Sequence, residues 1–191
     1  EHTPESFRPD ARLPHGAAYD NAPQQRAFTA LALDHVALAT TDGLTGALTR
    51  PGLLTLMPGL GATAQRAGQE VCVMRFDIDQ LRRANADYGT HYGDDVLRAV
   101  SKAIHDTVRQ GDLVARWGED EFLVAGLGDR PDAEALATRI AVAVQESGVN
   151  LGKWPTTVTV GTAAGDPAVT SFDALAQEAV PRAFPQAHLV G

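Results

Sequence analysis

Cysteine is almost missing from this chain of 191 residues, which contains only Cys72, so an internal disulfide is excluded. The apolar run around it, Val71 to Phe76, indicates a buried strand in which a cysteine serves as a small hydrophobic side chain. A surplus of positive charge is also missing, since 16 Lys and Arg face 24 Asp and Glu for a net charge of −8. This balance argues against nucleic-acid binding and against membrane contact by this segment, but is compatible with a local basic pocket for a small phosphorylated ligand.

Long hydrophobic runs are missing too, because no stretch reaches the roughly 18–20 apolar residues of a membrane-spanning helix. The best candidate, Phe28 to Ala39, is interrupted by Asp34 and His35. No basic segment leads into an apolar one at the N-terminus, so no signal peptide is predicted. We expect a cytoplasmic location. Because the chain has no initiator Met, the interpretation that it is the cytoplasmic part of a longer sensor protein stays open.

The remaining sequence predicts one domain with an N-terminal extension. Residues 1–23 carry four prolines among polar residues and are predicted to be a flexible linker. Residues 24–41 are predicted to form a helix that leads into a domain over 42–191. Apolar patterns predict strands over 70–76, 112–117, 121–127 and 156–163, and helices from 51 and over 94–108, 131–144 and 172–180. Because strands and helices mix without strict alternation, we expect an α+β fold.

Acidic residues follow two of these strands. Asp77 ends the first strand, and Asp120 lies in the turn Gly118 to Phe122 between two strands that form a hairpin. If the strands are neighbours, Asp77 and Asp120 converge and can hold a hard divalent cation such as Mg²⁺, which suits phosphate chemistry.

The order of the motifs resembles the GGDEF family, the diguanylate cyclases that join two GTP molecules into cyclic di-GMP. The resemblance rests on Asp42 to Arg50 (DGLTGALTR), on Asp77-Ile78-Asp79 followed by Asn85, Gly89 and Gly93-Asp94, and on the hairpin Gly118 to Phe122 (GEDEF). It implies a nucleotidyl-cyclase-like, ferredoxin-like palm fold, with a central five-stranded, mostly antiparallel sheet flanked by helices. It covers about three quarters of the chain.

The resemblance also implies roles for individual residues. Mg²⁺ or Mn²⁺ accompanies bound GTP, and two subunits face each other in an active enzyme, which makes a homodimer an expected partner arrangement. The implied metal ligands are Asp77, the carbonyl of Ile78 and Asp120; the implied catalytic residues are Asp120, Glu121 and Arg82; the implied substrate contacts are Asn85, Asp94 and Gly118.

Each acidic residue also has a purely structural interpretation. Asp77 could cap a following helix, Asp94 could cap the helix predicted over 94–108, and acids at a hairpin tip are usually a solvated turn. The agreement of several motifs in family order favours the functional interpretation for Asp77, Asn85, Asp94 and Asp120.

Several positions depart from the family pattern. Glu119 replaces a glycine that permits close approach of the nucleotide and unusual turn geometry, and it adds bulk and negative charge facing a triphosphate. Gln80 and Leu81 occupy two positions after Asp79 where aromatic residues are common. Near the C-terminus, Ala187 stands where the family has a lysine that binds the phosphates, and Pro181 is expected to break the last helix.

A second motif is better preserved. Arg109-Gln110-Gly111-Asp112 is an RxxD tetrapeptide at the offset from the hairpin where the family binds cyclic di-GMP, and Arg139 occupies the place of a secondary arginine. Arginine offers a planar fork to guanine or phosphate, and aspartate accepts from guanine N–H groups. The structural alternative is an ordinary surface Arg–Asp pair.

Three functions follow. The first is a degenerate domain that binds cyclic di-GMP at the RxxD site with weak or absent GTP cyclisation. The second is an active diguanylate cyclase that tolerates Glu119. The third is a dimerisation scaffold whose nucleotide sites are relics.

Overall fold

The computed structural model describes residues 40–151 and 155–181. The predicted linker over 1–23 and the predicted helix over 24–41, apart from its last two residues, lie outside these ranges. The elements run in the order β1 (Leu48–Thr49), α2 (Arg50–Ala67), β2 (Val71–Ile78), α3 (Leu81–Tyr88), α4 (Thr90–Thr107), β3 (Leu113–Arg116), β4 (Glu121–Leu127), α5 (Arg130–Leu151), β5 (Val158–Gly165) and α6 (Phe172–Glu178).

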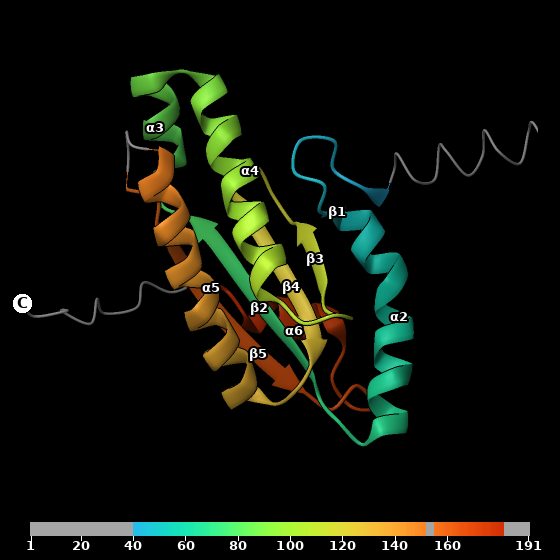
Figure 1. Ribbon diagram of the computed structural model, residues 1–191. Helices are drawn as coiled ribbons and strands as arrows, with labels where there is room; N and C mark the ends of the chain where they lie inside the picture. Colours follow the sequence, from blue (N-terminus) through green and yellow to red (C-terminus); the bar gives the residue numbers. More distant parts are fainter. Residues whose placement is uncertain (1–39, 152–154, 182–191) are drawn as a thin grey trace, which may run out of the picture. The chain divides into compact units, whose positions relative to one another are not determined.

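The strands form one sheet in the order β1-β3-β4-β2-β5 (Figure 1). The β1–β3 pair is parallel, whereas β3–β4, β4–β2 and β2–β5 are antiparallel. The predicted α+β fold with a five-stranded, mostly antiparallel sheet is therefore confirmed. The central strand, β2, lies between β4 and β5, which explains why nearly all of its side chains are buried.

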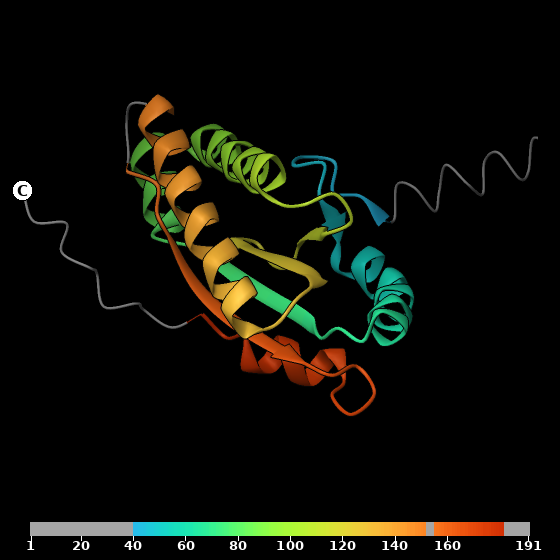
Figure 2. The same ribbon diagram turned by 60° about the horizontal axis from the view of Figure 1, so that its bottom comes forward.

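Helices cover both faces of the sheet, and β2 contributes alternate side chains to each. Cys72, Met74 and Phe76 belong to the core under α3, α4 and α5. Val71 and Val73 belong to the second core, under α2 and α6. Figure 2 shows α4 and α5 on one side of the sheet and α6 on the other.

The expectation for Cys72 is confirmed, because its side chain is buried in the first core. Burial, assisted by the negative charge of Asp112, raises the pKa of the Cys72 thiol to about 11. The thiol is therefore protonated at neutral pH and packs as an apolar group.

Two elements were not predicted, and three, α4, β2 and α5, were predicted too short. The two-residue strand β1 and the helix α3 carry too little apolar periodicity to be recognised in the sequence. The helix predicted from residue 94 begins at Thr90, directly after Gly89, whose φ of 88° separates α3 from α4. Strand β2 extends to Ile78 because Asp77 continues the ladder between Glu121 and Thr159.

In the described residues, none of the helices combines the length and the apolar content needed to cross a membrane.

Gly161 provides a test of how α6 is seated on the sheet. A Cβ at this position would lie 2.6 Å from the carbonyl oxygen of Ala179 and closer still to that of Val180. Because both obstacles are backbone atoms, we expect Gly161→Ala to lower the free energy of unfolding by about 2 kcal/mol, measured by urea titration.

The matched control is Gly61→Ala in α2, where the added Cβ would meet its nearest neighbour, in Pro167, at an ordinary 3.7 Å. This variant should be neutral or more stable by up to about 1 kcal/mol. Equal effects of the two substitutions would contradict the close packing of residues 179–180 on β5.

Candidate functional site

The β3–β4 hairpin ends in a short, well-held tip. The backbone N–H groups of Trp117 and Gly118 donate to the carbonyl of Glu121 at 2.8 and 3.2 Å, which leaves Gly118 to Asp120 as the tip. The Arg116 guanidinium donates to the carbonyl of Glu119 at 3.1 Å. The residues predicted to form an acidic hairpin therefore do so.

Arg116 also fixes the hairpin to the turn that begins at Asp42. Its Nη1 lies 3.3 Å from the Asp42 carboxylate, which accepts from the backbone N–H and the hydroxyl of Thr45 at 2.9 and 2.6 Å. Partial burial opposes ionisation of Asp42, but the Thr45 hydrogen bonds and the Arg116 charge outweigh it and lower its pKa. This pair could not be predicted from the sequence, because 74 residues separate its members.

Asp77 and the hairpin tip meet at one end of the sheet. In the β2–β4 ladder Asp77 stands opposite Glu121, and the backbone N–H of Ile78 donates to the carbonyl of Asp120 at 2.9 Å. Asp77 is therefore next to Asp120 in space although 43 positions separate them in the sequence. The predicted convergence of the two aspartates is present.

The electrostatics of this end suit a cation. Burial and then the negative charges of Asp120, Glu121 and Asp79 raise the pKa of Asp77, while Arg75 offsets part of the effect. A divalent cation would relieve this repulsion, since carboxylate and carbonyl oxygens are the ligands that Mg²⁺ prefers. The chain's own oxygen atoms therefore fit the metal that the family resemblance implies.

Two neighbouring acids, Asp79 and Glu121, already accept hydrogen bonds from other side chains. The Asp79 carboxylate accepts from the hydroxyls of Thr157 and Thr159 at 2.6 and 2.7 Å, and Glu121 accepts from Arg75 at 2.8 Å. Within the described ranges no group of three or more His, Cys, Asp or Glu forms a ready-made metal site. A cation at Asp77 and Asp120 would thus complete its shell with water or phosphate oxygens, as Mg²⁺ commonly does.

The predicted guanine contacts lie on two adjoining helices. Asn85 of α3 packs directly against Gly93 of α4, where an added Cβ would overlap the Asn85 side-chain oxygen. This oxygen is buried and has no hydrogen-bond partner among the described residues. An unpaired buried amide oxygen is costly, so Asn85 is a polar group at this end whose hydrogen-bonding capacity the described residues leave unused. Asp94 follows Gly93 in the second turn of α4 and is half-buried.

The capping alternatives for Asp77 and Asp94 are wrong. The residues at the N-cap positions of α3 and α4 are Gln80 and Gly89, and neither helix has a side-chain cap at its start. Asp77 remains in the strand, and Asp94 lies inside α4.

Gly118, Glu119 and Arg82 lie around the same end of the sheet. A Cβ at Gly118 would approach Glu121 Oε2 to 3.1 Å, so the glycine keeps room for that carboxylate. Among the described non-glycine residues only Gln80 has a positive φ, so Glu119 does not occupy a backbone conformation reserved for glycine. The turn accommodates Glu119 without a glycine-specific geometry, and what this side chain adds at the tip is bulk and negative charge. Arg82 is exposed on α3.

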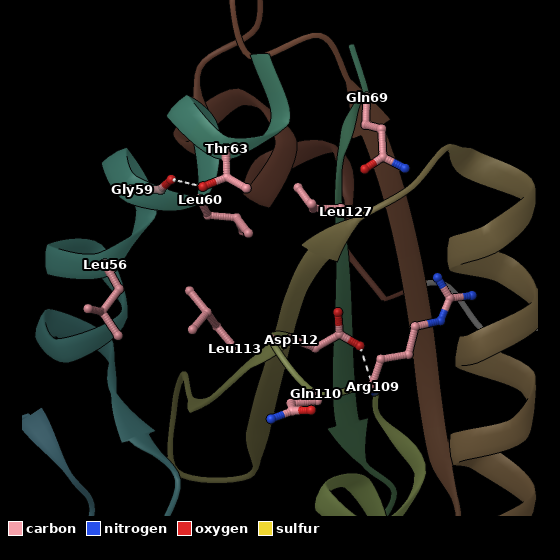
Figure 3. A pocket seen from close by; sticks show the side chains of 11 residues that line it. Leu56, Gly59, Leu60, Thr63, Gln69, Arg109, Gln110, Asp112, Leu113 and Leu127 are labelled. Carbon is pink, nitrogen blue, oxygen red and sulfur yellow. Dashed lines mark hydrogen bonds between the residues drawn. The ribbon is translucent and has the colours of Figure 1, made fainter. Parts of the chain in front are cut away.

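A pocket of about 480 Å³ lies between α2 and the turn from α4 to β3 (Figure 3). Its polar end carries Arg109 and Asp112, and the backbone N–H of Arg109 donates to the Asp112 carboxylate at 2.9 Å. Its apolar wall is formed by Leu56, Leu60, Leu113 and Leu127. The sequence predicted Arg109 and Asp112 as a binding pair, but it did not predict the leucine wall, to which α2 contributes Leu56 and Leu60.

Arg139 is near this pocket without lining it. Its Nη2 donates to the carbonyl of Thr107 at 3.3 Å, near the end of α4 and two residues before Arg109. Its guanidinium would have to leave that carbonyl to reach a ligand beside Arg109.

The two sites are at opposite ends of β4. The acidic tip precedes Glu121, where the strand begins, and the pocket contacts Leu127, where it ends. Six steps of about 3.3 Å separate these ends by about 20 Å, so one small ligand does not touch both sites.

The chain belongs to the GGDEF family, because the family model described as "Diguanylate cyclase, GGDEF domain" matches residues 39–182. It is 38% identical over 97 residues to the diguanylate cyclase DosC of Escherichia coli K12, an alignment that covers 51% of this chain and 21% of DosC. The chain thus spans about a fifth of the length of that curated relative.

Solved structures confirm the fold. The diguanylate cyclase SiaD of Pseudomonas aeruginosa, in complex with its activator SiaC, has a TM-score of 0.66 and 26% identity over 83% of this chain and 63% of SiaD. The GGDEF domain of DgcB from Caulobacter crescentus, in complex with c-di-GMP, has a TM-score of 0.58 and 25% identity over 73% of this chain and 85% of that domain.

The raised pKa of Asp77 leads to a prediction about stability. The native state holds the Asp77 proton to higher pH than the unfolded chain does, so this group's contribution to stability declines as the pH rises through its folded pKa. We expect Asp77→Asn to have a higher thermal midpoint than the unchanged protein at pH 7 without divalent cations, and this advantage to shrink towards pH 4.

The control is Glu146→Gln, which removes an exposed carboxylate on α5, far along the sequence from the acidic tip. It should leave the pH profile unchanged. A lower midpoint for Asp77→Asn than for the unchanged protein at pH 7 would contradict the repulsion described here.

Proposed function

We propose that this domain acts in cyclic di-GMP signalling, that it binds cyclic di-GMP in the Arg109–Asp112 pocket, and that its cyclisation of GTP is weak or absent. The single observation that supports the binding most strongly is the open pocket that holds Arg109 and Asp112 beside a wall of leucines. Its volume falls within the usual range of small-molecule sites.

The chemistry of the pocket suits a guanine base. The Asp112 carboxylate can accept from guanine N–H groups, and a guanidinium can donate to guanine N7 and O6 or to phosphate. The Arg109 side chain is exposed, and the hydrogen bonds between Arg109 and Asp112 use only backbone atoms of Arg109, so the guanidinium is available to a ligand. The leucines offer an apolar surface to the face of the purine. A relative, the GGDEF domain of DgcB, was solved with c-di-GMP.

Weak cyclisation follows from charge at the acidic tip. Glu119 is exposed between Gly118 and Asp120, and it adds a negative charge to a group that already raises the pKa of Asp77. A triphosphate brings further negative charge to the same place. The repulsion between two like charges about 4 Å apart amounts to about 1 kcal/mol in bulk water and more near a protein surface, and it weakens GTP binding accordingly.

An active diguanylate cyclase is the second candidate, and a specific observation favours it. Asp77 lies beside Asp120, and the buried side-chain oxygen of Asn85 has no hydrogen-bond partner among the described residues. When bound, Mg²⁺ or Mn²⁺ would neutralise phosphate charge at Asp77, Asp120 and the Ile78 carbonyl. In this candidate Asn85 and Asp94 orient the guanine, Arg82 and Glu121 act near the phosphates, and two subunits each present one GTP.

Titration with cyclic di-GMP tests the first candidate. We expect the unchanged chain to bind with measurable heat, and Arg109→Ala to weaken binding about ten- to hundredfold, because a charged hydrogen-bonding group is lost. Gly126→Ala should also weaken it, since the added Cβ would overlap the Asp112 carboxylate without touching Arg109. The control is Arg98→Ala, which removes an exposed arginine of α4 that pairs with Asp95.

Binding that is equal in Arg109→Ala and Arg98→Ala would reject the pocket as the binding site. If the unchanged chain binds neither cyclic di-GMP nor GTP with metal, the scaffold interpretation gains support.

A second test separates the two candidates. We expect the unchanged protein to form little or no cyclic di-GMP from GTP and Mn²⁺, and Glu119→Gly to raise the yield about five- to tenfold, because one repulsive carboxylate is removed. Chromatography measures the product. Substantial product from the unchanged protein would contradict the proposed loss of activity, and Glu146→Gln serves as the control for the loss of an exposed carboxylate outside the hairpin.

A further inference from the structure

Arg75 is a charged residue in the middle of an otherwise apolar strand. It follows four buried residues of β2 and precedes Phe76, and its own side chain is only 16% exposed. Its ladder neighbours are Leu123 on β4 and Gly161 on β5. Burying a guanidinium here carries a desolvation cost, so its position calls for compensating partners.

Those partners come from two other elements. Arg75 Nη2 donates to Glu121 Oε1 at 2.8 Å, and Nη1 donates to the carbonyl of Ala176 in α6 at 3.1 Å. The guanidinium is therefore anchored between the acidic hairpin and the last turns of a helix, where carbonyl groups carry partial negative charge. Its Nε is buried without a partner among the described residues.

This anchoring determines where the Glu121 carboxylate points. Glu121 stands opposite Asp77, but its Oε1 reaches across to Arg75, two positions further into β2. The Glu121 side chain is 24% exposed, and its Oε2 lies close to Gly118, where an added Cβ would come within 3.1 Å. One carboxylate oxygen is thus held by a largely buried cation, and the other lies in the space that Gly118 leaves free by having no Cβ.

We propose that Arg75 is a positioning residue that withholds the Glu121 carboxylate from the divalent cation site, so that Asp77 and Asp120 alone supply its carboxylate ligands. This inference rests on the cation site proposed above. Arg75 does this with its positive charge, while the second nitrogen of its planar fork donates to the carbonyl of Ala176. With Asp79 held by Thr157 and Thr159, the site is limited to two carboxylates out of the acids that surround it.

Mn²⁺ titration of the chain without nucleotide tests the proposal, with calorimetry or Mn²⁺ spectroscopy as the readout. Arg75→Met keeps an apolar stem and releases Glu121, so we expect Mn²⁺ affinity to rise about tenfold as a third carboxylate becomes available. Glu121→Gln alone should change the affinity less than about threefold, because Glu121 is not a ligand in the unchanged protein. In the double variant Arg75→Met/Glu121→Gln the gain should disappear.

Two outcomes would overturn the proposal. Unchanged Mn²⁺ affinity in Arg75→Met would show that Arg75 is only a structural ion-pair partner, and a gain that persists in the double variant would assign it to the lost positive charge. If neither the unchanged chain nor Arg75→Met binds Mn²⁺, the cation site is rejected together with this inference.

Arg75→Lys is a second variant that tests the proposal even if Arg75→Met fails to fold. It keeps a cation beside Glu121, so Mn²⁺ affinity should stay within about twofold of the unchanged chain, while the hydrogen bond to Ala176 is weakened. A tenfold rise in this variant would contradict the proposal, since the charge that holds Glu121 is retained.

Discussion

The register between β2 and β4 is the constraint on which both sites depend. It sets Asp77 opposite Glu121 and Val71 opposite Leu127, and the Ile78–Asp120 hydrogen bond of 2.9 Å extends it to the hairpin tip. A shift by one residue would turn Asp77 to the opposite face and move Phe76 from the first core to the second. The apolar residues of β2, buried on both faces, therefore fix the position of the acids at its end.

The same hairpin gives the domain two chemically different ends. At the tip, a group of acids is partly neutralised by Arg75 and partly engaged by threonines. At the other end, a basic and an acidic side chain share a pocket with leucines of α2 and the two strands. The acidic tip offers oxygen ligands to a cation that carries phosphates. The pocket offers hydrogen-bonding groups to the edge of a purine base. In the proposed function, the acidic tip is a GTP site at which cyclisation is weak or absent, and the pocket at the other end is a preserved site for cyclic di-GMP.

Much of this could be predicted from the sequence, because the buried strands and the motif order are local signals. The hairpin, the α+β class and the convergence of Asp77 with Asp120 followed from apolar runs that end in acids. The short strand β1, the helix α3, the pair of Arg116 with Asp42 and the role of Arg75 did not, because each depends on contacts between distant segments. The sequence also could not show that the backbone at residue 119 accommodates a glutamate without a positive φ, because this depends on how the hairpin tip is held.

The most direct test of the account is an anomalous difference map from a crystal of this protein grown with Mn²⁺. The account predicts a peak at about 2.1 Å, an ordinary metal–oxygen distance, from carboxylate oxygens of both Asp77 and Asp120, with Glu121 still paired to Arg75. A peak coordinated by Glu121, or aspartates that do not share a metal at saturating Mn²⁺, would contradict it.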